Sequence, residues 1–203
     1  MSKTGPWADY LDMFADLSDY FRRYGGIKAF ALSPYTLAAL LITVVCWGSW
    51  RVGSWPDTPL TILPALLGFT LAAYALLLAF GDEKFRAFLA EQQSDFVGTN
   101  VPGDNALLGI SAIFLHFVVV QVVALVLAVI ANSHPLATFG GLQATEHSLL
   151  HVLRNLYAFV GFFSFVLSLA LALAAGLAIF HSARWYVLFK GVEASVRGQS
   201  DPN

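Results

Sequence analysis

Charged residues are scarce in this chain. Asp, Glu, Lys and Arg make up 12% of its 203 residues, while 58% are hydrophobic. Soluble globular domains carry roughly 25% charged residues, which help to cover the surface that faces water. The composition therefore excludes a water-soluble domain and indicates an integral membrane protein.

Cysteine is scarce as well. Cys46 is the one cysteine of the chain, so no disulfide can form within it, and the net charge of −2 argues against a strongly basic surface for nucleic acid. The sequence lacks a glycine-rich phosphate loop, a nucleophile–base constellation and paired carboxylates within its apolar segments. We therefore predict no enzymatic activity and no cofactor. A solute carrier is the weakest candidate, because ion-coupled transport usually needs a buried Asp or Glu.

What the chain does have is four long apolar segments. Each has about 20 residues, the length at which a helix crosses the ~30 Å hydrocarbon layer of a bilayer. We predict an all-α fold, an integral membrane four-helix bundle over residues 32–181, with spans at 32–50, 59–80, 106–131 and 155–181. Residues 81–105 and 132–154 are the main connecting loops, and residues 182–203 form a tail.

Basic residues set the orientation. Nine of the eleven Lys and Arg residues lie in the two termini and in the 81–105 loop, whereas Arg51 and Arg154 lie on the other side. By the positive-inside rule, both termini and the 81–105 loop are cytoplasmic and the 132–154 loop is outside.

Aromatic residues follow two of the spans. Trp47, Trp50 and Trp55 surround the end of the first, and Trp185 and Tyr186 follow the fourth. Trp and Tyr favour the headgroup region, where one side of the ring is apolar and the other is wet. We expect both groups to be interfacial anchors.

The N-terminal segment, residues 1–31, is predicted to be a cytoplasmic amphipathic helix with a linker. Aromatic and leucine residues recur at helical spacing, and aspartates line the opposite face: Asp9, Asp12, Asp16 and Asp19. A helix for anionic lipid is usually basic on its polar face. Two interpretations stay open: packing against the cytoplasmic loops or the interface, or docking of another subunit or a soluble partner.

A second group of charges follows the second span, at its cytoplasmic end. Its members are Asp82, Glu83, Lys84 and Arg86, at the start of a short helix predicted within DEKFRAFLAEQ. They are either a solvated helix start with local ion pairs or a surface against which a partner presses.

Two polar residues interrupt the third span, His116 and Gln121. At 1.5 Å per residue, His116 lies about 15 Å and Gln121 about 22 Å from the cytoplasmic edge. The same arithmetic places Thr43 and Thr70 near the depth of His116. It places Ser164 and Ser168 of the fourth span near Gln121, so two polar layers are predicted.

These side chains have two interpretations. They are either hydrogen-bonding links between helices, worth about 0.6–2 kcal/mol each, or groups that line or gate a path. His116 and Gln121 are about 140° apart around the helix, so one is expected to face inward and the other a neighbouring subunit.

The fourth span carries a ridge of small residues at four-residue spacing: Ser164, Ser168, Ala172 and Gly176. Small side chains let membrane helices approach closely, so packing is the main interpretation and a pore wall the second. In the outer loop, His147 and His151 share a helical face with Arg154, which would repel a cation. We predict no metal site there.

The stretch LPALLGFTLAAYALLLAFGDEKF, with four helices and an acidic, aromatic N-terminal segment, resembles small bacterial membrane subunits of two-gene anti-phage defence systems of the Hailong and Kiwa types. The resemblance implies a homo-oligomeric effector or sensor in the bacterial inner membrane. A cytoplasmic partner would open or release it.

Because so few polar residues line four short-looped helices, any conduction must arise between copies. The leading hypothesis is a homo-oligomeric, channel-like effector, with a tetramer favoured, that is regulated through its cytoplasmic elements and surrounded by the lipid bilayer. The alternative is a non-conducting scaffold or sensor that recruits a soluble cytoplasmic partner.

Overall fold

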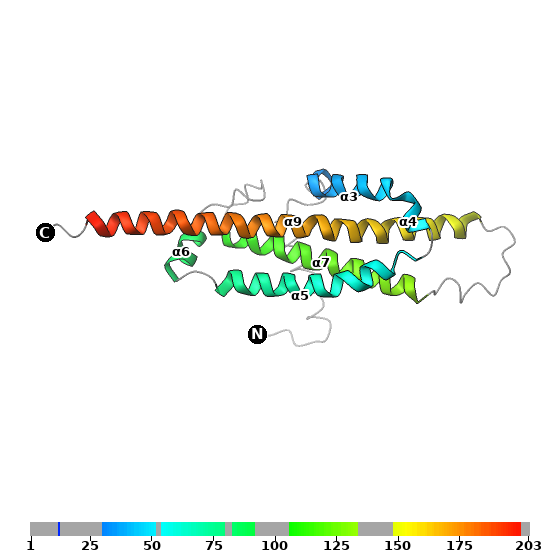
Figure 1. The fold of residues 1–203 in the computed structure, drawn as a ribbon, viewed down its shortest axis with the longest axis horizontal. Helices are drawn as coiled ribbons and strands as arrows, with labels where there is room; N and C mark the ends of the chain where they lie inside the picture. Colours follow the sequence, from blue (N-terminus) through cyan, green and yellow to red (C-terminus); the bar gives the residue numbers. More distant parts are fainter. Residues whose placement is uncertain are drawn as a thin grey trace. The chain divides into compact units, whose positions relative to one another are not determined.

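The computed structural model describes residue 12 and residues 30–51, 54–79, 83–91, 106–133 and 148–199. Within these ranges the chain is helical and has no strand, as the sequence predicted (Figure 1). Asp12 is helical and exposed, but the rest of the predicted N-terminal helix lies outside the described residues, including Asp9, Asp16 and Asp19. Asp82 and most of the 132–154 loop lie outside them as well.

Three helices are long and apolar enough to cross a membrane. They are α5 (Asp57–Ala79), α7 (Ala106–Asn132) and α9 (Ser148–Gln199). Their apolar side chains are largely exposed, including Phe69 at 69% and Leu173 at 63%. So large an exposed apolar surface is unfavourable in water and matches the chemistry of lipid tails. The protein is therefore a membrane protein, with three candidate spans where the sequence predicted four.

The first predicted span, 32–50, is divided in two. The helix α3 (Pro34–Val45) has 12 residues, and α4 (Trp47–Arg51) begins beyond a turn at Cys46. At 1.5 Å per residue α3 is about 18 Å long, well short of the ~30 Å hydrocarbon layer. The turn leaves carbonyl groups at the end of α3 in need of donors, and the indole N–H of Trp50 donates to the Thr43 carbonyl at 2.9 Å.

The fourth predicted span is part of a much longer helix. The sequence placed it at 155–181, but α9 has 52 residues and includes the end of the outer loop and most of the tail. No proline interrupts residues 148–199, and their glycines stand singly, so the helix has no local signal to stop. At 1.5 Å per residue α9 is about 78 Å long, which leaves a large part of it outside any hydrocarbon layer.

The chain forms two compact units. One contains residues 34–79 and 114–179, and its main apolar cluster combines Trp50 and Trp55 with Ala128 of α7 and Ala158 of α9. The aromatic ring of Trp50 lies edge-on to Phe159, with centroids 5.6 Å apart. This cluster packs α4, α7 and α9 together.

A close helix contact explains one glycine in this unit. Gly161 of α9 lies directly against the indole of Trp55, and a Cβ added there would come within 2.8 Å of the ring atom Cζ2. Any larger residue would have to displace the indole, which is 6% exposed. Gly161 therefore lets Trp55 fill the space between neighbouring helices.

The other unit includes residues 83–91 and 180–199. Here the short helix predicted after the second span is present as α6 (Glu83–Glu91). Its Phe85 is 4% exposed and packs with Phe88 of α6 and with Trp185, Tyr186 and Phe189 of α9. An aromatic cluster thus attaches α6 to the C-terminal part of α9.

Candidate functional site

Gln121 and Thr70 form a polar contact between α7 and α5 in the first unit, where the Tyr157 hydroxyl of α9 also donates to the Leu127 carbonyl of α7. The Gln121 amide Nε2 donates to the Thr70 hydroxyl oxygen at 3.3 Å, and both residues are 1% exposed. The Thr70 hydroxyl in turn donates to the Leu66 carbonyl of its own helix at 2.8 Å. A short chain of hydrogen bonds therefore links α7 to the backbone of α5.

The other end of the same amide is not satisfied. Among the described residues, no donor lies within hydrogen-bond distance of the buried Gln121 Oε1. A buried acceptor without a donor costs about 1–3 kcal/mol, more than a typical hydrogen bond returns. Chemically, this oxygen can accept a hydrogen bond from water or contribute to the coordination of a cation.

The depth arithmetic placed Thr70 level with His116, about five residues away from Gln121, so the pairing differs from the predicted layers. Two causes account for the difference. Helices tilt, so distance along the chain is not depth in the membrane, and the Gln side chain is long enough to reach along its own helix. His116 itself is 3% exposed. Both α7 residues are thus buried within one chain, although one was expected to face a neighbour.

The remaining hydroxyl candidates bond to their own helices. Thr43 donates to the Ala39 carbonyl, Ser164 to Val160 and Ser168 to Ser164, each at 2.8 Å. This bond to the carbonyl four residues earlier satisfies a hydroxyl hydrogen in a medium without water. Because the hydrogens are already engaged, these hydroxyls present acceptor lone pairs to their surroundings.

The predicted ridge of small residues on α9 is buried in its first half and exposed at its end. Ser164 and Ser168 are buried within the chain at 9% and 0% exposed. Ala172 is half-buried, whereas Gly176 is exposed and has nothing within 4 Å of an added Cβ. The two serines therefore pack inside the chain, and Gly176 lies on an outer face of α9.

The three tryptophans around the end of the first predicted span also differ in burial. Trp50 and Trp55 are core residues at 5% and 6% exposed, while Trp47 is 55% exposed. The guanidinium of Arg51 lies over the Trp47 ring, 4.5 Å from its centroid. Trp47 with Arg51 thus has the amphipathic character expected of an interfacial anchor, and the other two tryptophans serve helix packing.

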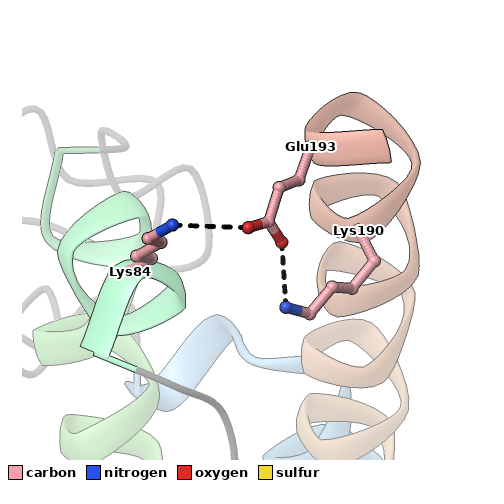
Figure 2. Close-up of polar contacts among 3 residues, drawn as sticks. All are labelled: Lys84, Lys190 and Glu193. Carbon is pink, nitrogen blue, oxygen red and sulfur yellow. Dashed lines mark hydrogen bonds and ion pairs between the residues drawn. The ribbon is translucent and has the colours of Figure 1, made fainter. Parts of the chain in front are cut away.

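A polar cluster accompanies the aromatic contact between α6 and α9. Glu193 accepts from the ammonium groups of Lys190 at 2.9 Å and of Lys84 at 3.5 Å, as Figure 2 shows. Lys84 was a predicted partner-binding residue and its side chain is 70% exposed. Glu83 is exposed beside it, and the side chain of Arg86 lies outside the described part of the structure.

Sequence reasoning missed Gly161, Lys190 and Glu193. A signal existed for two of them. Gly161 stands among large aromatic residues, and Glu193 is the one acidic residue of residues 148–199, so each is an exception in its helix. Their contact partners are distant in sequence, so no local pattern indicates which residues they contact.

No group of His, Cys, Asp or Glu among the described residues is arranged to hold a metal ion. His147 and the side chain of His151 lie outside those residues. Comparison of the chain with protein-family models, with curated proteins and with solved structures finds no match.

Proposed function

We propose that this protein is a homo-oligomeric, channel-like membrane effector of a bacterial inner membrane, regulated through its cytoplasmic elements, with a tetramer as the favoured assembly. The observation that carries the proposal is the buried Gln121, whose Oε1 has no donor among the described residues. A role in anti-phage defence rests on the resemblance of residues 63–85 alone.

The cost of this arrangement supports a functional role. Leucine at position 121 would fill a similar space in an apolar span without any polar group to satisfy. Polar side chains within membrane segments are expensive, and those that persist commonly mark a path or a switch. Gln121 has one amide end bonded to Thr70 and the other available to water or an ion.

The hydroxyl groups are buried within one chain, so a path that uses them would require the helices to rearrange when copies associate. Thr43 and Ser168 are both 0% exposed and use their hydrogens on their own helices. A conducting path must replace the hydration shell of an ion or hold water, which requires several polar groups around one lumen. One chain has few such groups in its described spans, whereas symmetry would repeat each of them around an oligomer axis.

The contact between α6 and α9 supports the proposal of regulation through the cytoplasmic side. The aromatic cluster around Phe85 joins α6 to a helix that continues without a break into the spanning region. A partner that displaces α6 would act directly on α9, because a continuous helix transmits movement along its axis.

The test is ion flux through liposomes that contain the purified protein. Gln121→Leu removes the polar group and should change the flux relative to the wild type. Thr61→Val is the matched control, because Thr61 is an α5 hydroxyl that bonds its own helix at Asp57 and is exposed. Wild-type flux in the Gln121→Leu protein would assign this side chain to packing and contradict the channel proposal.

The second candidate is a non-conducting scaffold or sensor that recruits a soluble cytoplasmic partner. The exposed Glu83 and Lys84 favour it, since α6 presents both charges on a helix fixed to α9. Deletion of residues 1–24 separates the two functions. A scaffold should lose partner binding with unchanged membrane permeability, whereas a gated channel should become leaky or locked.

A further inference from the structure

Arg51, the last residue of α4, carries a positive charge that no described acidic side chain balances. It is exposed, and its guanidinium has five N–H donors and stays charged at all physiological pH values. Among the described residues of its unit Asp57 is the one acidic residue, and the two side chains form no ion pair. The Arg51 side chain therefore retains the capacity to bind an anion.

The neighbouring Trp47 determines how this charge is presented. The guanidinium carbon of Arg51 lies over the Trp47 ring, 4.5 Å from its centroid. A cation–π contact of this kind restrains the side chain but takes up no hydrogen-bond acceptor, so N–H groups of the guanidinium stay available. Two of them can donate side by side to two oxygens of one phosphate, the geometry in which arginine binds phosphate most strongly.

Trp47 is itself held in place by the core of its unit. Its ring lies edge-on to that of Trp50, with centroids 5.4 Å apart. Trp50 is 5% exposed, donates its indole N–H to the Thr43 carbonyl and lies edge-on to Phe159 of α9. A continuous series of contacts thus leads from the core to Arg51. Such preorganisation lowers the entropy that a bound ligand would cost.

The residues that precede this pair indicate which anion it suits. At the end of α3, Leu41, Val44 and Val45 are 65%, 55% and 75% exposed, which is the chemistry of a surface for acyl chains. Along the chain an apolar surface is therefore followed by an exposed tryptophan and then by a cation. A phospholipid has the same order, from acyl chains through the interface to the phosphate. Inorganic phosphate would use the cation alone.

We propose that Arg51 and Trp47 form a binding site for a phospholipid, in which Arg51 donates to the phosphate oxygens and an acyl chain lies along the end of α3. Because the charge of Arg51 is not balanced by an acid, an anionic headgroup is favoured over a zwitterionic one. The preference is about fivefold, which corresponds to the ~1 kcal/mol that attracts one basic residue to an anionic membrane surface. The inference does not depend on the proposed channel or on the number of copies.

Retention of lipid in native mass spectrometry tests the site. The full-length protein is released from nanodiscs that contain equal amounts of phosphatidylglycerol and phosphatidylcholine, and the retained lipid should be enriched in phosphatidylglycerol by about fivefold. Arg51→Gln should abolish the enrichment, and Trp47→Leu should reduce it, because leucine keeps an apolar side chain without the ring. Arg154→Gln is the matched control, since Arg154 is exposed in the same unit but forms no cation–π contact or ion pair with the described residues.

A second variant separates geometry from charge. Arg51→Lys keeps the positive charge but lacks the planar guanidinium, so it should lose most of the enrichment while the helix content stays unchanged. Full enrichment in Arg51→Lys would show that charge alone suffices and would contradict the site. An equal loss in Arg51→Gln and Arg154→Gln, or no enrichment in the wild type, would overturn the inference. So would an adduct with the mass of inorganic phosphate, in place of lipid, when phosphate is added.

Discussion

Side chains in the spans use their hydrogens in two ways. The hydroxyls of Thr43, Thr70, Ser164 and Ser168 donate within their own helices, whereas the Gln121 amide and the Tyr157 hydroxyl each donate to another helix. The sequence identified Gln121 and Thr70 as polar residues of interest, since each stands out in an apolar segment. It did not pair them, because pairing depends on tilt and side-chain reach and not on distance along the chain. The structure supplies the pair at 3.3 Å.

The unsatisfied oxygen of Gln121 leads to a stability prediction. Gln121→Leu should stabilise the protein by about 1 kcal/mol, because relief of a 1–3 kcal/mol penalty exceeds the loss of one membrane hydrogen bond of about 0.6 kcal/mol. Thr70→Val should destabilise it by about 1 kcal/mol, since it leaves the Gln121 N–H without its acceptor. Thermal unfolding in detergent measures both. Destabilisation by Gln121→Leu would show that a ligand or water satisfies Oε1 in the working protein.

Gly161 provides a second test at this scale. Gly161→Ala should destabilise the protein by about 1–3 kcal/mol, because the new methyl group overlaps the indole of Trp55. Gly68→Ala is the control within α5, where nothing lies within 4 Å of an added Cβ, and it should stabilise by up to about 1 kcal/mol. The same unfolding temperature for both variants would mean that the contact between Trp55 and Gly161 is absent.

Helices as elements were predictable where apolar composition alone defines them. The second and third spans agree with α5 and α7 to within two residues at each end, because long apolar runs are the strongest signal in such a sequence. The bounds of the first and fourth spans could not be predicted in this way. The turn at Cys46 has no proline or glycine to mark it, and α9 continues beyond residue 181 because no proline or paired glycine follows within residues 182–199, whereas the prediction ended the span where its apolar run ends.

The attachment of α6 to α9 should depend on aromatic packing more than on charge. Phe85→Ala should cost about 3 kcal/mol, as is typical for a buried phenylalanine, and should raise amide hydrogen exchange in α6. Glu193→Gln should cost under about 1 kcal/mol, because the Lys84 ammonium that it faces is largely solvated. Hydrogen exchange measured by mass spectrometry compares the two. A larger effect from Glu193→Gln would reverse this order.

At the scale of the whole molecule, the main feature is an apolar surface suited to lipid. Its composition predicted a membrane protein, and three long apolar helices with exposed apolar faces agree. The proposed function depends on contacts between distant helices, such as that of Gln121 with Thr70, which the sequence does not pair. In the proposed oligomer, symmetry would repeat the Gln121 pair in every copy of the chain.

The most direct measurement of this central claim is the mass of the intact assembly released from lipid nanodiscs, determined by native mass spectrometry. The account predicts a multiple of the 22.0 kDa chain, with four copies favoured. A mass of one chain at every protein concentration and in every lipid would contradict it.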